Sequence, residues 1–564
     1  MYRDLLLAID LGEPASQQGA LARAVELARA FGCRLHVMTV VPSYGMSIVG
    51  SFFPKDFEAK ALAKAGDALH AFVAEHVPAE VPVQHIVAHG TVYEEILRVA
   101  RETRVDLIVI GSGPGGYHAA IRAAQLGLKV ACVEKGDVGG VCLNVGCIPT
   151  KALLHVAHTL EEGRHAGAYG VTFGEPSLDL EALATWQAGV VKKHTGGVAA
   201  LLKGNKVTLV QGEARFVEPN ALQVGDRRLT ADRFVVATGS RPIALPGFDL
   251  DGERVVDSTG ALRMTRVPKR FLALGGSAIG LEFADLYASF GSEVTVVELM
   301  DRIAPTADPD ASKALHKALE KKGIRIRTGT KAVSQKKTKA GTEVVLEAKD
   351  GTRDTIVVDK LLVAVGRTPN GKGLGLEEIG VKVDERGFVP TADTMQTNLA
   401  HVYAIGDVAR APLLAHKAMK EALVAAEHAA GKKAAYDTLV PGVIYTHPEL
   451  ASVGMTEGEA KDAGFEVRVG AFPLTASGRA TTMGATDGLF KVVADAKTDL
   501  VLGVHIVGPS AGDLIAEATL AMEMGATVED LGATQHPHPT LSEGLMEAAE
   551  HAHGRAIHIA NRRR

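Results

Sequence analysis

Two Gly-rich turns, at 111–116 and 275–280, each follow an apolar strand-like run and open a helix-like segment. Glycines in such a turn let the backbone approach a pyrophosphate, and the helix that follows offers unpaired N–H groups to it. The next apolar run ends in each case on a glutamate, Glu134 or Glu298, placed to accept hydrogen bonds from a ribose. The chain is therefore expected to contain two α/β domains that bind dinucleotides.

The second turn differs from the first at its middle position, where Ser277 replaces glycine. The weaker alternative is that this segment is only a tight strand-to-helix turn. Glu298 favours NAD over NADP, because a carboxylate accepts from a free ribose hydroxyl and repels a phosphate.

A close-spaced cysteine pair, Cys142 and Cys147, follows the first turn. Five residues of regular helix rise about 7.5 Å, beyond the roughly 7 Å that an unstrained disulfide can bridge. A bond between them requires an irregular turn, which Gly146 permits, and Pro149 suits the first turn of a following helix. A structural staple and half of a zinc site are the alternatives, but zinc needs further close ligands. The pair therefore indicates an exchangeable disulfide that moves electrons between thiols and a bound cofactor.

The composition limits the partners. The 564 residues carry a net charge of only -5 with a pI near 6.5, so no basic field indicates nucleic acid or an anionic membrane. No metal site is expected. The start of the chain mixes charges before a short apolar run, which predicts a strand and not a signal peptide, and no apolar stretch is expected to span a bilayer. Four cysteines in this length are typical of a reducing compartment, so a cytoplasmic protein is expected.

The first hundred residues alternate predicted strands and helices, as in an α/β layered unit. The expected strands are 5–9, 35–41 and 83–87, and the expected helices are 20–31, 59–76 and 93–101. Asp10, His89-Gly90 and the run into Gly111 resemble the universal stress protein family over residues 1 to about 112. That resemblance implies an adenine nucleotide near Asp10.

The chain departs from that family at the phosphate loop, because Leu126 stands where a further glycine is expected. Nucleotide binding and a docking or vestigial role are therefore alternatives for this unit. One strand cannot easily be the centre of two sheets, so 106–110 is assigned to the downstream domain. The first unit then keeps three strands.

Two further apolar runs end in glycine-containing loops, at 237–240 and 402–407, and both could return the chain to the first cofactor. Near the end of the chain, His538 stands between prolines with Glu543 five residues on. A histidine polarised by a carboxylate is a general base suited to neutral pH. A lone histidine is more often a satisfied core or surface residue, but the prolines and Glu543 favour function.

The order of these motifs resembles the pyridine nucleotide-disulphide oxidoreductases, and from about 105 to 564 the chain resembles their dihydrolipoamide dehydrogenase branch. The blocks that carry the resemblance are CLNVGCIPTK, ATGS, AVGRTPN, VYAIGDV, YTHPELASVG and HPHPTLSE. The resemblance implies an α/β chain whose three-stranded first unit precedes two Rossmann-like domains and an α+β dimerisation domain. The expected boundaries are 1–104 for the stress-protein-like unit, 105–253 for FAD, 254–380 for NAD, 381–444 for a central FAD-contacting segment and 445–564 for dimerisation.

The resemblance also implies roles for individual residues. Cys142 is the interchange thiol and Cys147 the thiol nearer the flavin, Lys151 pairs with Glu282 beside the flavin, and the His538–Glu543 dyad reaches the disulfide of the other subunit. The implied cofactor contacts are Gly111, Gly113, Gly116, Glu134, Gly140, Thr238, Gly239, Asp407 and Ala415 for FAD, with Gly275, Gly280, Glu298 and Gly366 completing the set.

The implied activity is the FAD-dependent oxidation of dihydrolipoamide with reduction of NAD. The implied partners are a second copy of the chain and a lipoyl-bearing acyltransferase (E2) or the H protein of glycine cleavage. The alternatives are another NAD(P)H-dependent flavoprotein disulfide reductase, or a nucleotide-responsive stress regulator whose reductase part is inert.

Overall fold

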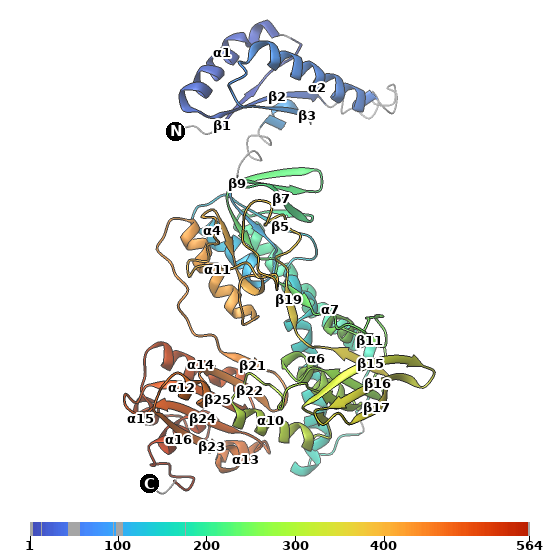
Figure 1. Cartoon of the computed structure of the whole chain (residues 1–564), viewed down its shortest axis with the longest axis vertical. Helices are drawn as coiled ribbons and strands as arrows, with labels where there is room; N and C mark the ends of the chain where they lie inside the picture. The colour runs from blue at the N-terminus through green and yellow to red at the C-terminus, as the bar shows by residue number, and fades with distance from the viewer. Residues whose placement is uncertain are drawn as a thin grey trace. The chain divides into compact units, whose positions relative to one another are not determined.

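The computed structural model describes residues 4–12, 14–42, 57–93, 95–96, 105–174 and 176–561. The chain forms two compact units, the first comprising residues 1–105 with 227–231 and the second comprising 106–226 and 232–564. Figure 1 traces both units along the chain.

The amino-terminal unit has a parallel sheet of three strands in the order β1-β2-β3. Its elements are β1 (Asp4–Ala8), α1 (Pro14–Phe31), β2 (Arg34–Pro42), α2 (Phe57–His76) and β3 (Val83–Gly90). Leu35 and Val37 point to one face of β2, and they share a buried cluster with Leu21 of α1 and Leu69 of α2. Both helices therefore cover the same face. The helix expected at 93–101 falls mostly outside the described residues.

The first module of the larger unit is a sheet in the order β6-β5-β4-β9-β8-β7, with β20 beside β9. Its strands are β4 (Val105–Ile110), β5 (Val130–Glu134), β6 (Thr208–Gln211), β7 (Ala214–Glu218), β8 (Ala221–Val224), β9 (Arg227–Val236) and β20 (Val402–Ala404). Its helices are α4 (Pro114–Gln125), α5 (Gly140–Val145), α6 (Cys147–His165), η2 (Ala166–Tyr169), α7 (Leu180–Gly204), η3 (Gly406–Val408) and α11 (Ala415–Ala429). The strand β4 thus pairs inside this sheet, next to β5.

The second module has a five-stranded parallel sheet in the order β11-β18-β12-β13-β14. The module also contains an antiparallel sheet in the order β15-β16-β17. Strand β10, which precedes the parallel sheet in sequence, pairs antiparallel with β19, which follows it. The elements are β10 (Ser240–Pro242), β11 (Val255–Val256), α8 (Ser258–Leu262), β12 (Arg270–Leu274), α9 (Ala278–Ser289), β13 (Glu293–Val297), α10 (Pro309–Lys321), β14 (Arg325–Arg327), β15 (Thr330–Thr338), β16 (Gly341–Ala348), β17 (Arg353–Val358), β18 (Lys360–Val363) and β19 (Arg367–Pro369).

The third module is an antiparallel sheet in the order β21-β22-β25-β24-β23. Its elements are β21 (Gly442–Ile444), β22 (Glu449–Gly454), α12 (Glu457–Asp462), β23 (Val467–Pro473), η4 (Leu474–Ala476), α13 (Gly478–Thr482), β24 (Leu489–Asp495), β25 (Val501–Gly508), α14 (Ala511–Glu523), α15 (Val528–Ala533) and α16 (Glu543–Ala552). The predicted fold class, two Rossmann-like modules followed by an α+β module, is confirmed.

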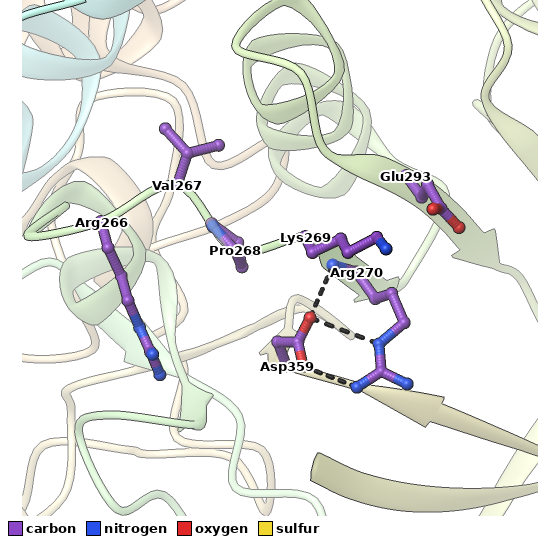
Figure 2. A pocket seen from close by; sticks show the side chains of 7 residues that line it. All are labelled: Arg266, Val267, Pro268, Lys269, Arg270, Glu293 and Asp359. Atoms are coloured by element: carbon purple, nitrogen blue, oxygen red, sulfur yellow. Dashed lines mark hydrogen bonds and ion pairs between the residues drawn. The ribbon is translucent and has the colours of Figure 1, made fainter. Parts of the chain in front are cut away.

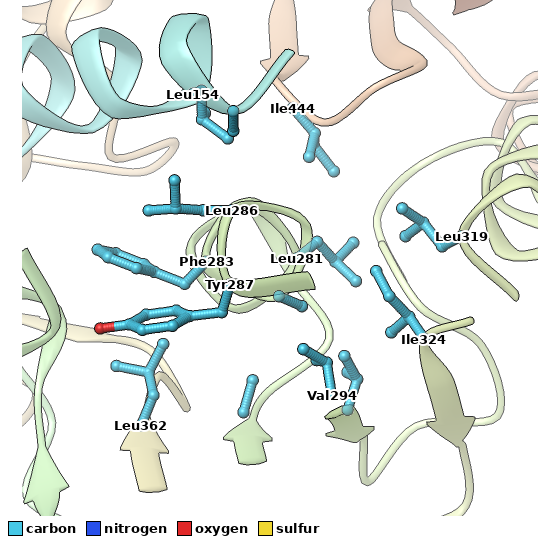
Figure 3. Packing of buried hydrophobic residues seen from close by; sticks show 14 of the residues in the cluster. Leu154, Leu281, Phe283, Leu286, Tyr287, Val294, Leu319, Ile324, Leu362 and Ile444 are labelled. Atoms are coloured by element: carbon cyan, nitrogen blue, oxygen red, sulfur yellow. The ribbon is translucent and has the colours of Figure 1, made fainter. Parts of the chain in front are cut away.

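The largest hydrophobic cluster is centred on α9, as Figure 3 shows. Leu154 from α6 and Ile444 from β21 meet the buried face of α9, where Phe283 and Tyr287 lie. The Tyr287 ring stacks on Phe271 with centroids 4.1 Å apart. Residues from all three modules therefore share one core, which fixes the helix that begins with the second cysteine.

The helical run Gly140–Tyr169 is, among the described residues, the one helix long and apolar enough to cross a membrane. The expectation that no stretch reaches this length is therefore wrong on length and composition. Leu153, Leu154 and Ala157 of this run are buried against the core. These residues of the run pack into the core of the larger unit, and the cysteine pair lies near the start of the run.

Candidate active site and cofactor sites

The two cysteines form a disulfide at a break between two helices. Cys142 lies in α5, Cys147 begins α6, and Gly146 separates them with φ -138° and ψ -113°. This break brings the two Cα atoms to 4.7 Å, whereas a continuous helix would hold them about 7.5 Å apart. A Cβ on Gly146 would lie 2.9 Å from the carbonyl oxygen of Val141. The predicted irregular turn is present, and Gly146 is required for it.

The first Gly-rich turn packs too closely for side chains at two of its three positions. A Cβ on Gly116 would lie 1.8 Å from the carbonyl oxygen of Gly111, and a Cβ on Gly111 would lie 2.5 Å from that of Ala237. At Gly113, by contrast, the nearest atom to a Cβ would be the Cα of Gly140, at 4.0 Å. Gly113 therefore keeps open a cradle that polypeptide does not fill, at the amino end of α4. This cradle fits a pyrophosphate.

Gly140 belongs to the same cradle. It has a φ of +58°, and a Cβ there would come within 2.8 Å of the Cα of Gly113. The turn that leads into the disulfide thus rests directly on the first Gly-rich turn. The redox pair and the cofactor cradle are therefore one structural feature.

The carboxylate of Glu134 is buried at the end of β5 and holds the cradle. Its Oε2 accepts hydrogen bonds from the backbone N–H of Ser112 at 2.8 Å and from the Ser112 hydroxyl at 2.7 Å. Its Oε1 accepts from the N–H of Gly136 at 2.8 Å. The carboxylate is thus fixed in place, with acceptor capacity left for a ribose hydroxyl. Ser112 was not predicted as a site residue, although it lies inside the glycine motif.

Lys151 and Glu282 form the expected ion pair between α6 and α9. The Lys151 Nζ lies 2.9 and 2.8 Å from the two carboxylate oxygens. The backbone N–H of Tyr445 donates to Glu282 Oε1 at 3.1 Å, and the Lys151 Nζ sits 4.4 Å from the centre of the Tyr445 ring. All three modules therefore contribute a residue to this ion-pair cluster. Lys151 lies one helical turn after Cys147.

Asp407 lies in the loop after β20 and is bonded to a second loop. Its carboxylate accepts from the Ser240 hydroxyl at 2.5 Å, and the Arg367 guanidinium donates to the same hydroxyl at 2.7 Å. Burial lowers the pKa of Arg367, with the nearby carboxylate of Asp407 opposing the change. Ser240 and Arg367 were not predicted as site residues, and polar side chains directly after the strand and glycine signals could have indicated them.

Four further predicted contacts line these loops. Thr238 donates from its hydroxyl to the Asn370 carbonyl oxygen at 3.0 Å, and Gly239 turns the chain with φ +68°. Gly366 has φ +129°, and Ala415 is the first residue of α11. These four residues therefore lie on the segments that follow β9, β18 and β20. In α/β sheets, ligands bind beyond the carboxyl ends of the strands, where such segments lie.

The second Gly-rich turn repeats the first in the second module. A Cβ on Gly280 would lie 1.8 Å from the carbonyl oxygen of Gly275, and one on Gly275 would lie 2.3 Å from that of Ala364. Ser277 is extended, with φ -98° and ψ -175°, as Gly113 is with φ -64° and ψ -177°. The backbone at this position does not need glycine, so serine is compatible with the turn.

Glu298 occupies in the second module the place that Glu134 has in the first. Its carboxylate accepts from the N–H of Gly276 at 2.6 Å and from the N–H of Met300 at 2.8 Å. A buried, fixed carboxylate here fits a ribose diol and disfavours a phosphate.

A cavity of about 600 Å³ lies at the amino end of β12, the end away from the Gly-rich turn (Figure 2). There the backbone N–H and the guanidinium of Arg270 donate three hydrogen bonds to the Asp359 carboxylate, the shortest from Nη2 to Oδ1 at 2.7 Å. Dinucleotides bind at the carboxyl ends of parallel strands, and Arg270 begins β12. This cavity is therefore separate from the cofactor sites.

His538 and Glu543 form a dyad at the start of α16. The imidazole Nδ1 lies 2.9 Å from Glu543 Oε1, and the N–H of Thr540 donates to Glu543 Oε2 at 2.8 Å. Partial burial opposes ionisation of Glu543, but these two hydrogen bonds outweigh it and hold its pKa below the usual range. The His538 side chain is 78% exposed, and among the described residues no hydrogen bond joins it to either cysteine. Within one chain, the dyad and the disulfide are therefore not brought together.

The chain matches three family models. Residues 105–422 match the pyridine nucleotide-disulphide oxidoreductases, and residues 440–549 match their dimerisation domain, which supports a homodimer. Residues 1–123 match the universal stress protein family. The first and third matches overlap over 105–123, where the structure places β4 in the larger unit.

Several named proteins are similar to the chain. Dihydrolipoyl dehydrogenase from Thermus scotoductus is 61% identical over 81% of this chain and 99% of its own. The Bacillus subtilis enzyme of that name is 46% identical over 80% of this chain and 97% of its own. LpdA from Mycobacterium tuberculosis has a TM-score of 0.73 at 27% identity and matches 79% of this chain and 99% of its own. The HOCl-induced flavoprotein disulfide reductase RclA from Escherichia coli has a TM-score of 0.71 at 26% identity, with the same shares covered. The chain belongs to the dihydrolipoyl dehydrogenases of the pyridine nucleotide-disulphide oxidoreductase family, and it carries a universal stress protein domain at its amino end.

Proposed function

We propose that this chain oxidises protein-bound dihydrolipoyl groups to lipoyl groups and reduces NAD. The observation that carries the proposal is the Cys142–Cys147 disulfide, whose turn rests on the first dinucleotide cradle through Gly140. The similarity to dihydrolipoyl dehydrogenases supports the same substrate.

The thiol chemistry uses the disulfide as the electron acceptor. A dihydrolipoyl thiolate attacks the Cys142 Sγ, the S–S bond breaks, and Cys147 leaves as a thiolate. The second lipoyl thiol, once deprotonated, attacks the lipoyl sulfur of the mixed disulfide and releases Cys142. The lipoyl dithiol is thereby oxidised to a disulfide, and the cysteine pair holds the two electrons.

The proton of the attacking thiol passes to His538, because only the thiolate is an effective nucleophile. Glu543 orients the imidazole through its Nδ1 and stabilises its charged form. The exposure of His538 supports a base that acts on the disulfide of the partner subunit.

FAD and NAD, when bound, would supply the redox chemistry that accepts these two electrons. The residues that would hold FAD are the cradle at Gly113, the carboxylate of Glu134 and Asp407. The Lys151–Glu282 ion pair would contribute to the charge environment of the flavin, and Glu298 would favour NAD over NADP.

The physiological role proposed is that of the E3 component of a 2-oxo acid dehydrogenase or glycine-cleavage complex. Its partner is then a lipoyl-bearing acyltransferase or the H protein. With four cysteines in the chain, its compartment is the reducing cytoplasm.

The test is NADH formation from dihydrolipoamide and NAD by the purified chain and by Cys142→Ser. The wild-type chain should be yellow and active, whereas Cys142→Ser should keep FAD and lose lipoamide turnover. Cys33→Ala, which removes a buried thiol of the amino-terminal unit, is the control and should remain active. Turnover by Cys142→Ser would contradict the assignment of the interchange thiol.

A further inference from the structure

A buried ion pair forms hydrogen bonds to the backbone of the loop that contains Asp407. Lys417 and Glu421 lie one turn apart on α11, and their side chains are only 1% and 0% exposed. The Lys417 Nζ lies 3.1 Å from Glu421 Oε1. Neither residue belongs to the cofactor contacts described above.

Both backbone groups of Gly406 are bound by this pair. The N–H of Gly406 donates to Glu421 Oε2 at 2.7 Å, and its carbonyl oxygen accepts from the Lys417 Nζ at 3.3 Å. The same Nζ also donates to the carbonyl oxygen of Arg410 at 2.7 Å. Gly406 has φ +74°, so the loop turns sharply at the residue that the ion pair holds. The next residue along the chain is Asp407.

The carboxylate of Asp407 is held from the other side by Ser240, which Arg367 binds in turn. The loop is thus fixed at its backbone by α11 and at its side chain by the loop after β9. This arrangement leaves the Asp407 side chain little freedom to change its orientation.

The charges of the pair are costly to keep in this place. Burial lowers the pKa of Lys417, and the Glu421 carboxylate opposes that change. A buried ion pair seldom contributes more stability than apolar residues of the same volume, and its best-supported use is to fix one conformation. The conformation that this pair fixes is that of the Gly406–Asp407 turn.

We propose that Lys417 and Glu421 are positioning residues for FAD, which hold Asp407 in its binding orientation through the backbone of Gly406. The proposal rests on the proposed function only for the identity of FAD. Its test measures FAD affinity and needs no dihydrolipoamide turnover, so the two can fail independently.

The test compares Lys417→Met with the double variant Lys417→Met/Glu421→Leu. The single variant removes the lysine partner of the buried Glu421 carboxylate, which keeps only the Arg410 Nε at 3.3 Å and the N–H of Gly406. It should lose both thermal stability and FAD affinity. The double variant removes that charge and should recover the thermal midpoint of the apoprotein. Its FAD dissociation constant should remain roughly ten- to a hundredfold above that of the wild type, the effect of a lost hydrogen bond to a charged group. Release of fluorescent FAD on dilution measures the dissociation constant.

A matched control is Lys491→Met, which also removes a buried lysine. Its Nζ binds Asp308, Asp310 and Glu457 at 2.7–3.1 Å, and its side chain is 2% exposed. This variant should lower the thermal midpoint and leave FAD affinity unchanged. The proposal is overturned if the double variant binds FAD as tightly as the wild type, or if Lys491→Met weakens FAD as much.

Discussion

At the scale of single residues, the chemistry follows from the immediate partner of each side chain. The thiol of Cys132 illustrates the contrast with the redox pair, because burial raises its pKa to about 12, with the charge of Glu134 adding to the effect. A thiol held neutral in this way is inert. His538, by comparison, is exposed and bonded to an ionised carboxylate, as a base that meets a substrate must be.

Replacing the base tests this assignment directly. His538→Gln should lower the rate of dihydrolipoamide oxidation by about 10²–10⁴, the usual contribution of a positioned base. Electron transfer from NADH to a dye does not need that base, so this diaphorase activity should persist. Steady-state rates of both reactions with one preparation provide the comparison. Equal loss of the two activities would indicate a collapsed dimer and would contradict the role of His538 as base.

At the scale of elements, the glycines of the turn between β4 and α4 serve two purposes. Gly116 allows close backbone packing, and Gly113 leaves space for a ligand. Gly116→Ala should prevent correct folding of the turn, because its Cβ would lie 1.8 Å from the carbonyl oxygen of Gly111. Gly113→Ala should fold normally, because its nearest neighbour would be 4.0 Å away, yet bind FAD weakly, since the methyl group enters the cradle. Thermal midpoints and FAD content distinguish the two. Wild-type FAD affinity in Gly113→Ala would mean that the pyrophosphate lies elsewhere.

Helix α9 joins the modules through two carboxylates one turn apart. Glu282 accepts the N–H of Tyr445, and Asp285 accepts the N–H of His447 at 2.9 Å. Burial opposes ionisation of Asp285, but His158 and Lys322 outweigh it and hold its pKa below the usual range. A lowered pKa stabilises the fold at neutral pH, and that stabilisation is lost as the pH falls through the folded-state pKa.

Asp285→Asn keeps the acceptor for His447 and removes only the charge. We expect the variant to lose about 3–5 kcal/mol of stability at pH 7, the cost of breaking a buried ion pair. The difference from the wild type should shrink below about pH 4, where the unfolded carboxyl is protonated. Thermal midpoints across this range measure it. Asp354→Asn, which removes an exposed partner of Arg327, should cost at most about 1 kcal/mol. An equal loss in both variants would refute the effect of burial.

At the scale of the whole molecule, the residues of the sites described all follow Val105 in the sequence. Two family models overlap at 105–123, but β4 pairs with β5 of the larger unit and cannot also complete the three-stranded sheet. Strand β4 lies between β5 and β9 in the sheet of the larger unit, so hydrogen-bond partners occupy both of its edges. Among the described residues, the sheet of the universal stress protein domain consists of β1, β2 and β3.

A chain that begins at Thr103 should accordingly show the same kcat and KM for dihydrolipoamide and NAD as the full chain. All predicted catalytic and cofactor residues follow Val105. Parallel steady-state assays of the two chains measure this. A changed KM or kcat would mean that the amino-terminal unit influences the active site.

Sequence spacing was sufficient for features that depend on local geometry. The two Gly-rich turns, the glutamates at the ends of β5 and β13, and the helix break at Gly146 each follow from steric rules over a few residues. The ion pair of Lys151 with Glu282 came from family resemblance, and the two residues are 131 positions apart. The hydrogen bonds of Ser240 with Asp407 and with Arg367 could not be predicted from the sequence, because these partners lie 167 and 127 positions away.

The sequence by itself determined the chemistry of this protein, namely a reducible cysteine pair between two dinucleotide turns and a histidine–glutamate dyad. It could do so because backbone sterics and hydrogen-bonding capacity are properties of short segments. Only the tertiary structure decided which sheet contains β4, which buried charges hold the Gly406–Asp407 turn, and that the His538 side chain is exposed. These outcomes depend on competition between distant segments for the same neighbours, and burial settles that competition only when the whole chain is folded.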